Sequence, residues 1–161
     1  MNHMTGRFTA LLFTLALCLL LTGCGEKPQA AAPIDCAALG EAILGAQDFS
    51  PDVETMSRTR LLALLEMEEA QLDDAFMALD ASRASAECVI VVTAGSGKEG
   101  EVKALLEAYR DSLLAQYRDY QPGEVPKLEA SKVIVRGAQC VLAVAPDQQA
   151  AVSACEAKWN E

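Results

Sequence analysis

The residue with the clearest chemical role is Cys24, which closes the run Leu21-Thr22-Gly23-Cys24. An apolar stretch from Phe8 to Leu21 precedes it, and only Arg7 is charged before that point. A thiol is the best side-chain nucleophile for alkylation. Small residues in front of it let a peptidase approach the backbone. These features mark Cys24 as a candidate site of covalent modification at the end of a secretory signal.

This run resembles the bacterial lipoprotein box, whose cysteine receives a thioether-linked diacylglyceryl group before a signal peptidase cuts in front of it. The resemblance implies a signal peptide over residues 1–23 and a membrane contact through diacylglyceryl-Cys24, on the extracytoplasmic face of the cell membrane. Two acyl chains, at about 0.8 kcal/mol per buried methylene, hold a protein stably. The weaker alternatives are an ordinary cleaved signal and an uncleaved anchor. The apolar stretch is short for an anchor, since a spanning helix needs about 20 apolar residues.

The charge of the chain limits its partners. The sequence has 23 acidic and 13 basic residues, and residues 1–23 contribute only Arg7, so the rest carries 12 basic residues and a net charge near −11. Nucleic acids and anionic lipid surfaces attract basic footprints. The composition therefore predicts no nucleic-acid partner and favours basic partners or cations.

The only histidine is His3, inside the predicted signal. A mature chain without histidine has no Ser-His-Asp or Cys-His pair and lacks the commonest ligand of zinc and non-haem iron. Catalysis would depend on carboxylates, lysines, tyrosines or thiols alone. We predict no catalytic residue, no metal ligand and no cofactor.

Four cysteines follow the anchor: Cys36, Cys88, Cys140 and Cys155. None belongs to a CxxC motif, and three of them lie in apolar runs, where cysteine acts as a small buried hydrophobe. Free core thiols are the favoured interpretation. At least one disulfide stays open as the alternative, because an exported protein permits it and four cysteines allow three pairings.

The segment from Gly95 to Gly100 is a GxGxxG pattern between a predicted strand and a predicted helix. A dinucleotide site would need a βαβ crossover with an acidic residue about 20 positions later. A Walker loop would need Ser or Thr where Glu99 stands. We interpret the glycines as serving a turn and a helix start.

Two other clusters have structural and functional interpretations. The acidic run from Glu66 to Asp74 offers calcium ligands but lacks the spacing of an EF-hand, which favours a solvated acidic face or helix end. Tyr109, Tyr117 and Tyr120 share one face of a predicted helix and could face a ligand. Helical spacing more often indicates core or edge packing.

The positioning elements follow from the periodicity of apolar residues. A tether over residues 24–33 precedes one domain over residues 34–161. The patterns predict this order: a helix from the N-cap Asp35 to Gly45, a helix from Pro51 or Ser57 to Leu65, a strand or helix tail from Asp74 to Asp80, a central strand from Cys88 to Ala94, a helix from Glu101 to Tyr120 ended by Pro122-Gly123, strands Val133–Val135 and Cys140–Val144, and a helix whose first residue is Pro146.

The order α-α-β-β-α-β-β-α predicts an α+β fold in two layers, with a four-stranded, mainly antiparallel sheet and its helices packed on one face. Gly137-Ala138 suits a type II′ turn, which would place Arg136 opposite Gln139 and Val135 opposite Cys140. The residues expected in or near the core are Val89, Val91, Leu105, Tyr109, Ile134, Leu142, Val152 and Trp159.

The lipoprotein box, the tether, the first helix, the strand from Glu87 to Ala94, the helix that opens near Lys98-Glu99, the hairpin at Val133–Gly137 and the closing helix together resemble a family of short Gram-positive lipoproteins with a domain of unknown function. The resemblance covers most of the mature chain and implies a location and an order of elements. It brings no activity and no binding residues. The pattern differs at Ser85-Ala86, where turn residues are usual, and in its many cysteines.

We therefore predict a non-enzymatic, lipid-anchored binding or accessory module that contacts a cell-envelope protein or another envelope component. The alternative is a carboxylate- or thiol-based enzyme, or an enzyme accessory, with a site near the loop from Gly95 to Gly100. A solute receptor is disfavoured, because such receptors usually have two lobes and a longer chain.

Overall fold

A five-stranded antiparallel sheet runs through the computed structural model, which describes residues 32–161. The predicted signal peptide over residues 1–23, Cys24 and most of the predicted tether lie outside the described residues. Within residues 32–161, no helix has the length and apolar character that crossing a membrane requires. The strands, in sheet order, are β1 Val53–Thr55, β2 Leu72–Asp80, β3 Cys88–Ala94, β5 Gln139–Val144 and β4 Val133–Arg136.

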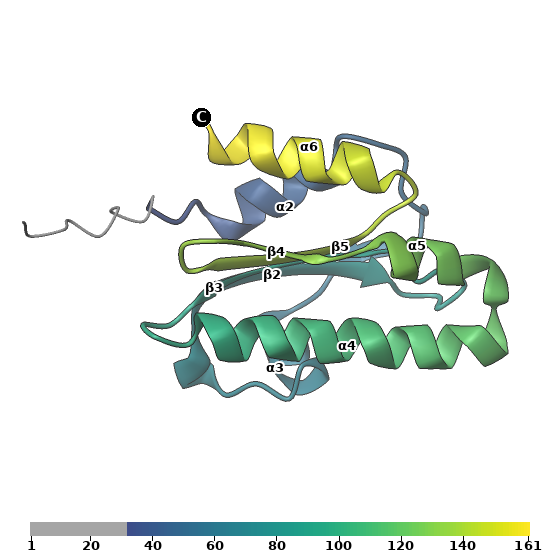
Figure 1. The fold of residues 1–161 in the computed structure, drawn as a ribbon, viewed down its shortest axis with the longest axis horizontal. Coiled ribbons are helices and arrows are strands. Elements are labelled where there is room, and N and C mark those ends of the chain that lie inside the picture. The colour runs from purple at the N-terminus through teal and green to yellow at the C-terminus, as the bar shows by residue number, and fades with distance from the viewer. Residues whose placement is uncertain (1–31) are drawn as a thin grey trace, which may run out of the picture.

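Helices cover both faces of this sheet (Figure 1), so the prediction of helices on one face is wrong. One face carries α2 Cys36–Leu44 and α6 Gln148–Trp159, and the other carries α3 Arg58–Leu64, α4 Glu99–Tyr120 and α5 Val125–Ala130. The cause is visible in β3, all of whose residues are buried. Ile90 and Val92 pack in the cluster with α4, whereas Val89 and Val91 pack in the cluster with α2 and α6. A strand that is apolar throughout is one covered on both sides.

The prediction of four strands is also wrong, because β1 pairs with the end of β2 at Val53↔Asp80 and Thr55↔Ala78. The alternative helix start at Pro51 fails for the same reason. Helix α3 begins at the other predicted position, where the Ser57 hydroxyl accepts a hydrogen bond from the Arg60 N–H at 3.3 Å. The segment from Asp74 to Asp80, left open between strand and helix tail, belongs to β2.

The β4–β5 hairpin has the predicted register, with Arg136 opposite Gln139 and Val135 opposite Cys140. Gly137 has a φ of +57°, and Ala138 is not among the described residues with positive φ, as a type II′ turn requires. Asp35 caps α2 as predicted, since its Oδ1 accepts from the Ala38 N–H at 2.8 Å.

The last helix departs from its prediction. Asp147 is its N-cap and accepts from the Ala150 N–H at 3.0 Å, so Pro146 lies before the helix rather than at its first position. An aspartate oxygen satisfies a free helical N–H directly, which proline cannot do. The short helix α5, which follows the predicted stop at Pro122-Gly123, has no counterpart among the predicted elements.

Most of the predicted core residues are buried or lie against the core. Four are buried, namely Val89, Val91, Leu142 and Trp159. Leu105, Tyr109 and Ile134 are partly buried and pack against the two clusters. Val152 is also only partly buried, and Ala151 takes the buried position at that turn of α6.

The two ends of the sheet differ in what they hold. Near the Thr93 end of β3, the buried Gln139 amide donates to the Ile34 carbonyl at 2.6 Å and accepts from the Ile34 N–H at 3.1 Å. Its Oε1 also accepts from the indole N–H of Trp159 at 3.0 Å. The chain therefore enters the fold at this end, and Cys88 marks the opposite end of the same strand.

Gly40 in α2 offers a test of the packing between α2 and β2. A glycine-to-alanine change inside a helix normally stabilises by about 0.5–1 kcal/mol. At Gly40 an added Cβ would overlap the ring of the buried Phe76. We expect Gly40→Ala to lower the free energy of unfolding by about 1–3 kcal/mol, the usual cost of overpacking.

Gly100 in α4 is the matched control, because an added Cβ there would meet open space. Gly100→Ala is expected to stabilise by about 0.5 kcal/mol. Urea denaturation of both variants measures the two effects. If Gly40→Ala stabilised as much as Gly100→Ala, the close approach of α2 to Phe76 would be refuted.

Candidate functional site

A cleft of about 580 Å³ opens between α3, α4 and the segment that joins β2 to β3. This volume lies within the usual range of small-molecule sites, about 300–1,000 Å³. Its walls combine aromatic, cationic and hydroxyl side chains. The lining residues are Arg60, Leu64, Leu79, Asp80, Ser82, Arg83, Ser85, Ala86, Glu87, Cys88, Tyr109, Ser112, Leu113, Gln116, Tyr117 and Tyr120.

All three tyrosines of the chain line this cleft, and all three come from α4. Their exposure to solvent differs: Tyr117 is buried in the wall, Tyr109 is partly buried, and Tyr120 at the rim is 71% exposed. Burial raises the pKa of the Tyr109 phenol, which therefore stays a hydrogen-bond donor. Its hydroxyl has no hydrogen-bond partner among residues 32–161. The stripe contributes both edge packing and an open polar group.

Two guanidinium groups face the same cleft, Arg60 from α3 and Arg83 from the segment after β2. Neither side chain forms an ion pair or a hydrogen bond with any residue of the described part of the chain. Burial raises the pKa of Tyr109, and the positive charges of Arg60 and Arg83, which line the same cleft, oppose that rise. The cleft is thus lined by three donor groups, the guanidinium groups of Arg60 and Arg83 and the Tyr109 hydroxyl. None of them has a hydrogen-bond or ion-pair partner within residues 32–161.

The segment from Ala81 to Glu87 is fixed to the helices beneath it. The Tyr117 hydroxyl donates to the Ser85 carbonyl at 2.6 Å and to the Arg83 carbonyl at 3.2 Å. Glu124 accepts from the Ser85 hydroxyl at 2.7 Å and from the Ala86 N–H at 2.9 Å. Arg83 adopts a left-handed φ of +62° within this segment. Such a conformation costs about 1–2 kcal/mol for a residue other than glycine and persists only where the surroundings impose it.

The carboxylates of the cleft are already bound by their own partners. Asp80 accepts hydrogen bonds from the hydroxyls of Ser50 and Ser82. Burial alone would raise the pKa of Asp80, but these hydrogen bonds hold it below its usual value. Glu87 accepts from the Ser50 N–H at 2.6 Å and from the Lys127 ammonium at 2.7 Å. Neither carboxylate forms an ion pair with Arg60 or Arg83.

The loop from Gly95 to Gly100 lies at the N-terminal end of α4, whereas the cleft tyrosines come from the middle and the C-terminal end of this helix. It is a turn in which the Lys98 N–H donates to the Gly95 carbonyl at 2.9 Å and Gly97 takes a φ of +75°. The Lys98 ammonium pairs with Glu101 at 2.9 Å. The glycines thus serve a turn and a helix start, and none of them lines the cleft.

The acidic run from Glu66 to Asp74 is divided among separate contacts. Glu69 pairs with Arg58 at 2.7 Å. Asp74 accepts from the Cys36 N–H at 2.9 Å and so joins β2 to the start of α2. Glu66, Glu68, Glu69 and Asp73 are exposed, which agrees with a solvated acidic face, whereas the alternative of a helix end is wrong because Asp73 and Asp74 belong to strand β2.

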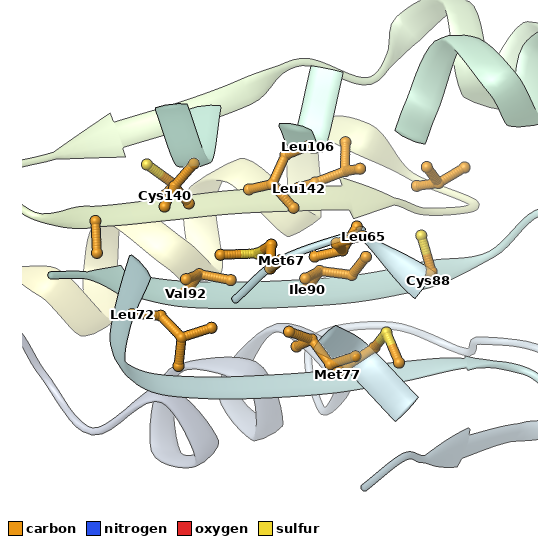
Figure 2. Packing of buried hydrophobic residues seen from close by; sticks show 14 of the residues in the cluster. Leu65, Met67, Leu72, Met77, Cys88, Ile90, Val92, Leu106, Cys140 and Leu142 are labelled. Atoms are coloured by element: carbon orange, nitrogen blue, oxygen red, sulfur yellow. The ribbon is translucent and has the colours of Figure 1, made fainter. Parts of the chain in front are cut away.

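All four cysteines within residues 32–161 are free and buried, as favoured from the sequence. Cys88 and Cys140 lie at different ends of the paired strands β3 and β5. Cys140 is opposite Val92, whereas Cys88 is opposite Val144. Figure 2 shows both thiols in the same apolar cluster but at different ends of it. Burial raises the pKa of Cys88, which lines the floor of the cleft, to about 12.

The sequence did not identify this cleft. Its donors come from α3, from the segment after β2 and from α4, and no local spacing joins Arg60 to Arg83 or Tyr109. The tyrosine stripe was the one available signal.

Comparison with known proteins gives one match. The family model described as "Domain of unknown function (DUF4358)" matches residues 46–145, more than half of the chain. The matched span contains the five strands and every residue that lines the cleft. No curated protein and no solved structure matches the chain.

Proposed function

We propose that the chain, which belongs to the family described as "Domain of unknown function (DUF4358)", is a lipid-anchored extracytoplasmic module that binds a component of the cell envelope. The proposal joins two independent observations. One is the sequence that ends at Cys24, which resembles a lipoprotein box. The other is the cleft between α3 and α4.

The cleft carries the binding part of the proposal. Tyrosine and arginine dominate the energetics of binding sites, because they combine apolar area with directional donors. Here Arg60, Arg83 and the Tyr109 hydroxyl are uncommitted within residues 32–161, while the segment that carries Arg83 is held in place. A pre-formed wall with free donors binds a ligand at a low ordering cost.

The anchor and the cleft would lie at opposite ends of the sheet. The chain enters the fold at Ile34, beside Thr93 and Gln139, whereas Asp80, Glu87 and Cys88 mark the cleft end. The five residue steps from Cys88 to Thr93 correspond to roughly 16 Å along β3. A tether over residues 24–33 would span roughly 18 Å if it behaves as a flexible coil. The cleft would then be available to envelope components beyond the lipid surface.

Cys24→Ala tests the anchor. Without the thiol no diacylglyceryl group can be attached, so the protein should lose lipid labelling and leave the membrane fraction or fail to be processed. Growth with an alkyne-tagged fatty acid, followed by membrane fractionation, measures both effects. The prediction is loss of essentially all label.

Cys18→Ala is the matched control, because Cys18 lies in the same apolar stretch and would be removed with the signal. It should keep full labelling and full membrane retention. Retained lipid label in Cys24→Ala would refute the anchor, whatever the cleft binds.

A further inference from the structure

We propose that the cleft binds an anionic ligand whose acidic group is held by Arg60, Arg83 and the Tyr109 hydroxyl, and whose apolar or aromatic body lies against Tyr117, Tyr120 and Leu64. This inference rests on the proposed binding function and names its ligand class. The acidic group is a carboxylate, a sulfonate or a phosphate, which share the acceptor oxygens that the site requires.

The donor set selects an anion. A guanidinium has five N–H donors and no acceptor, and a phenol with a raised pKa donates its proton. Three such groups around one cleft match a group that carries several acceptor oxygens and a negative charge. Both arginines are exposed and form no ion pair within residues 32–161, so an anion in the cleft would give them a bound counter-charge.

The neighbouring carboxylates form no ion pair with either arginine. Asp80 is held by two serine hydroxyls, and Glu87 by the Ser50 N–H and the Lys127 ammonium. The Lys127 ammonium also pairs with Glu124 at 3.0 Å. The negative groups at this end of the sheet therefore have their own partners, while Arg60 and Arg83 have none among residues 32–161.

Long-range electrostatic attraction cannot explain a preference for anions, because the chain as a whole carries a net charge of −10. Such a protein repels anions at long range. Anion binding would therefore reflect the local arrangement in the cleft. The segment that carries Arg83 is held in place, since the Tyr117 hydroxyl donates to the Ser85 carbonyl and Glu124 accepts from the Ala86 N–H.

The rim and walls fit an apolar body. Leu64 and Tyr120 are among the exposed large hydrophobic residues of the described chain, and both line this cleft. Leu113 and Tyr117 continue the apolar wall inward. An aromatic ring between these side chains would bury area next to the site for the acid.

A pair of fluorescent probes separates the two halves of the site. Anilinonaphthalene sulfonate carries an acidic group, and phenylnaphthylamine has the same aromatic body without it. The purified full-length protein is placed in phosphatidylcholine nanodiscs, and the signal of empty nanodiscs is subtracted. We expect the sulfonate to bind about ten-fold more tightly than the neutral probe, and added salt to weaken only the sulfonate.

The variant Arg60→Gln/Arg83→Gln should remove that preference and change neutral-probe affinity by less than two-fold. Arg118→Gln is the control, because Arg118 lies on α4, the helix that carries the cleft tyrosines, but pairs with Glu129 and does not line the cleft. Arg83→Gly gives a second test, since glycine favours the left-handed backbone and keeps the segment folded. It should lower sulfonate affinity several-fold while the circular dichroism spectrum stays unchanged.

The outcomes distinguish the two proposals. Equal affinity for both probes, or an anion preference that survives Arg60→Gln/Arg83→Gln, would overturn the anionic site and leave the cleft as a binding site for neutral ligands. Failure of both probes to bind would overturn the anionic site and the binding role of the cleft together.

Discussion

Lys127→Met is expected to lower the free energy of unfolding by about 3 kcal/mol. The Lys127 ammonium lies 2.7 Å from a Glu87 oxygen and 3.0 Å from Glu124, and the side chains of these glutamates are only 6% and 11% exposed. Methionine keeps the apolar stem but leaves two largely buried carboxylates without their cation. Glu124 also binds Ser85 and the Ala86 N–H, so the wall of the cleft should loosen as well.

Lys103→Met provides the matched control. Lys103 pairs with Glu107 at 3.4 Å on the exposed side of α4, where the side chains are 47% and 40% exposed. Pairs of this kind contribute well under 1 kcal/mol, so this variant should change stability by about 0.5 kcal/mol or less. Urea denaturation at neutral pH compares the two. Equal effects would show that the pairing of Lys127 is no more than a surface contact.

The second large effect is a steep loss of stability above about pH 9. Burial raises the pKa of Cys36, Cys88 and Cys155 from 9.0 to about 12, and that of Cys140 to about 11. In the unfolded chain these thiols ionise near pH 9, while in the folded chain they keep their protons. The unfolded state therefore binds fewer protons above pH 9, and the free energy of unfolding falls as the pH rises.

Each thiol contributes about 1.4 kcal/mol per pH unit between its unfolded and folded pKa values. Together the four described thiols should cost about 5 kcal/mol per unit between pH 9.5 and pH 10.5. Burial also raises the pKa of Tyr109 and Tyr117, which adds to the loss above about pH 10. Below pH 8 the thiols are protonated in both the folded and the unfolded state, so they cause no change of the free energy of unfolding with pH there.

Urea denaturation with a reductant present, at pH 7, pH 9 and pH 10.5, measures this slope. Cys155→Ala should reduce the slope by about a quarter, because it removes one of four thiols. The cavity it leaves lowers stability equally at every pH and does not affect the slope. A midpoint that stays constant from pH 7 to pH 10.5 would show that the thiols are not protonated core groups.

Local signals predicted the elements that depend on neighbouring residues. Gly137-Ala138 determined the register of the β4–β5 hairpin, and Asp35 and Ser57 marked two helix starts. The β-branched run in β3 identified a central strand. In each case the residues that decide the structure lie within a few positions of one another.

The missed features depend on distant contacts. Strand β1 has three residues, too few for a periodic pattern, and it exists because β2 pairs with it. The second helical layer follows from the burial of β3 on both sides, which its composition indicated but the two-layer prediction did not use. The cleft was missed because Arg60, Arg83 and Tyr109 meet only in the folded chain.

Site-specific photocrosslinking in intact cells tests most directly the claim that the cleft binds a component of the envelope. A photoreactive phenylalanine at Tyr120 would lie at the rim of the cleft, and the same group at Gln149 would lie exposed on α6, on the other face of the sheet. We predict a discrete adduct from position 120 that is lost in Arg60→Gln/Arg83→Gln and absent from position 149. No adduct at position 120, or the same adducts at both positions, would contradict the proposed role of the cleft.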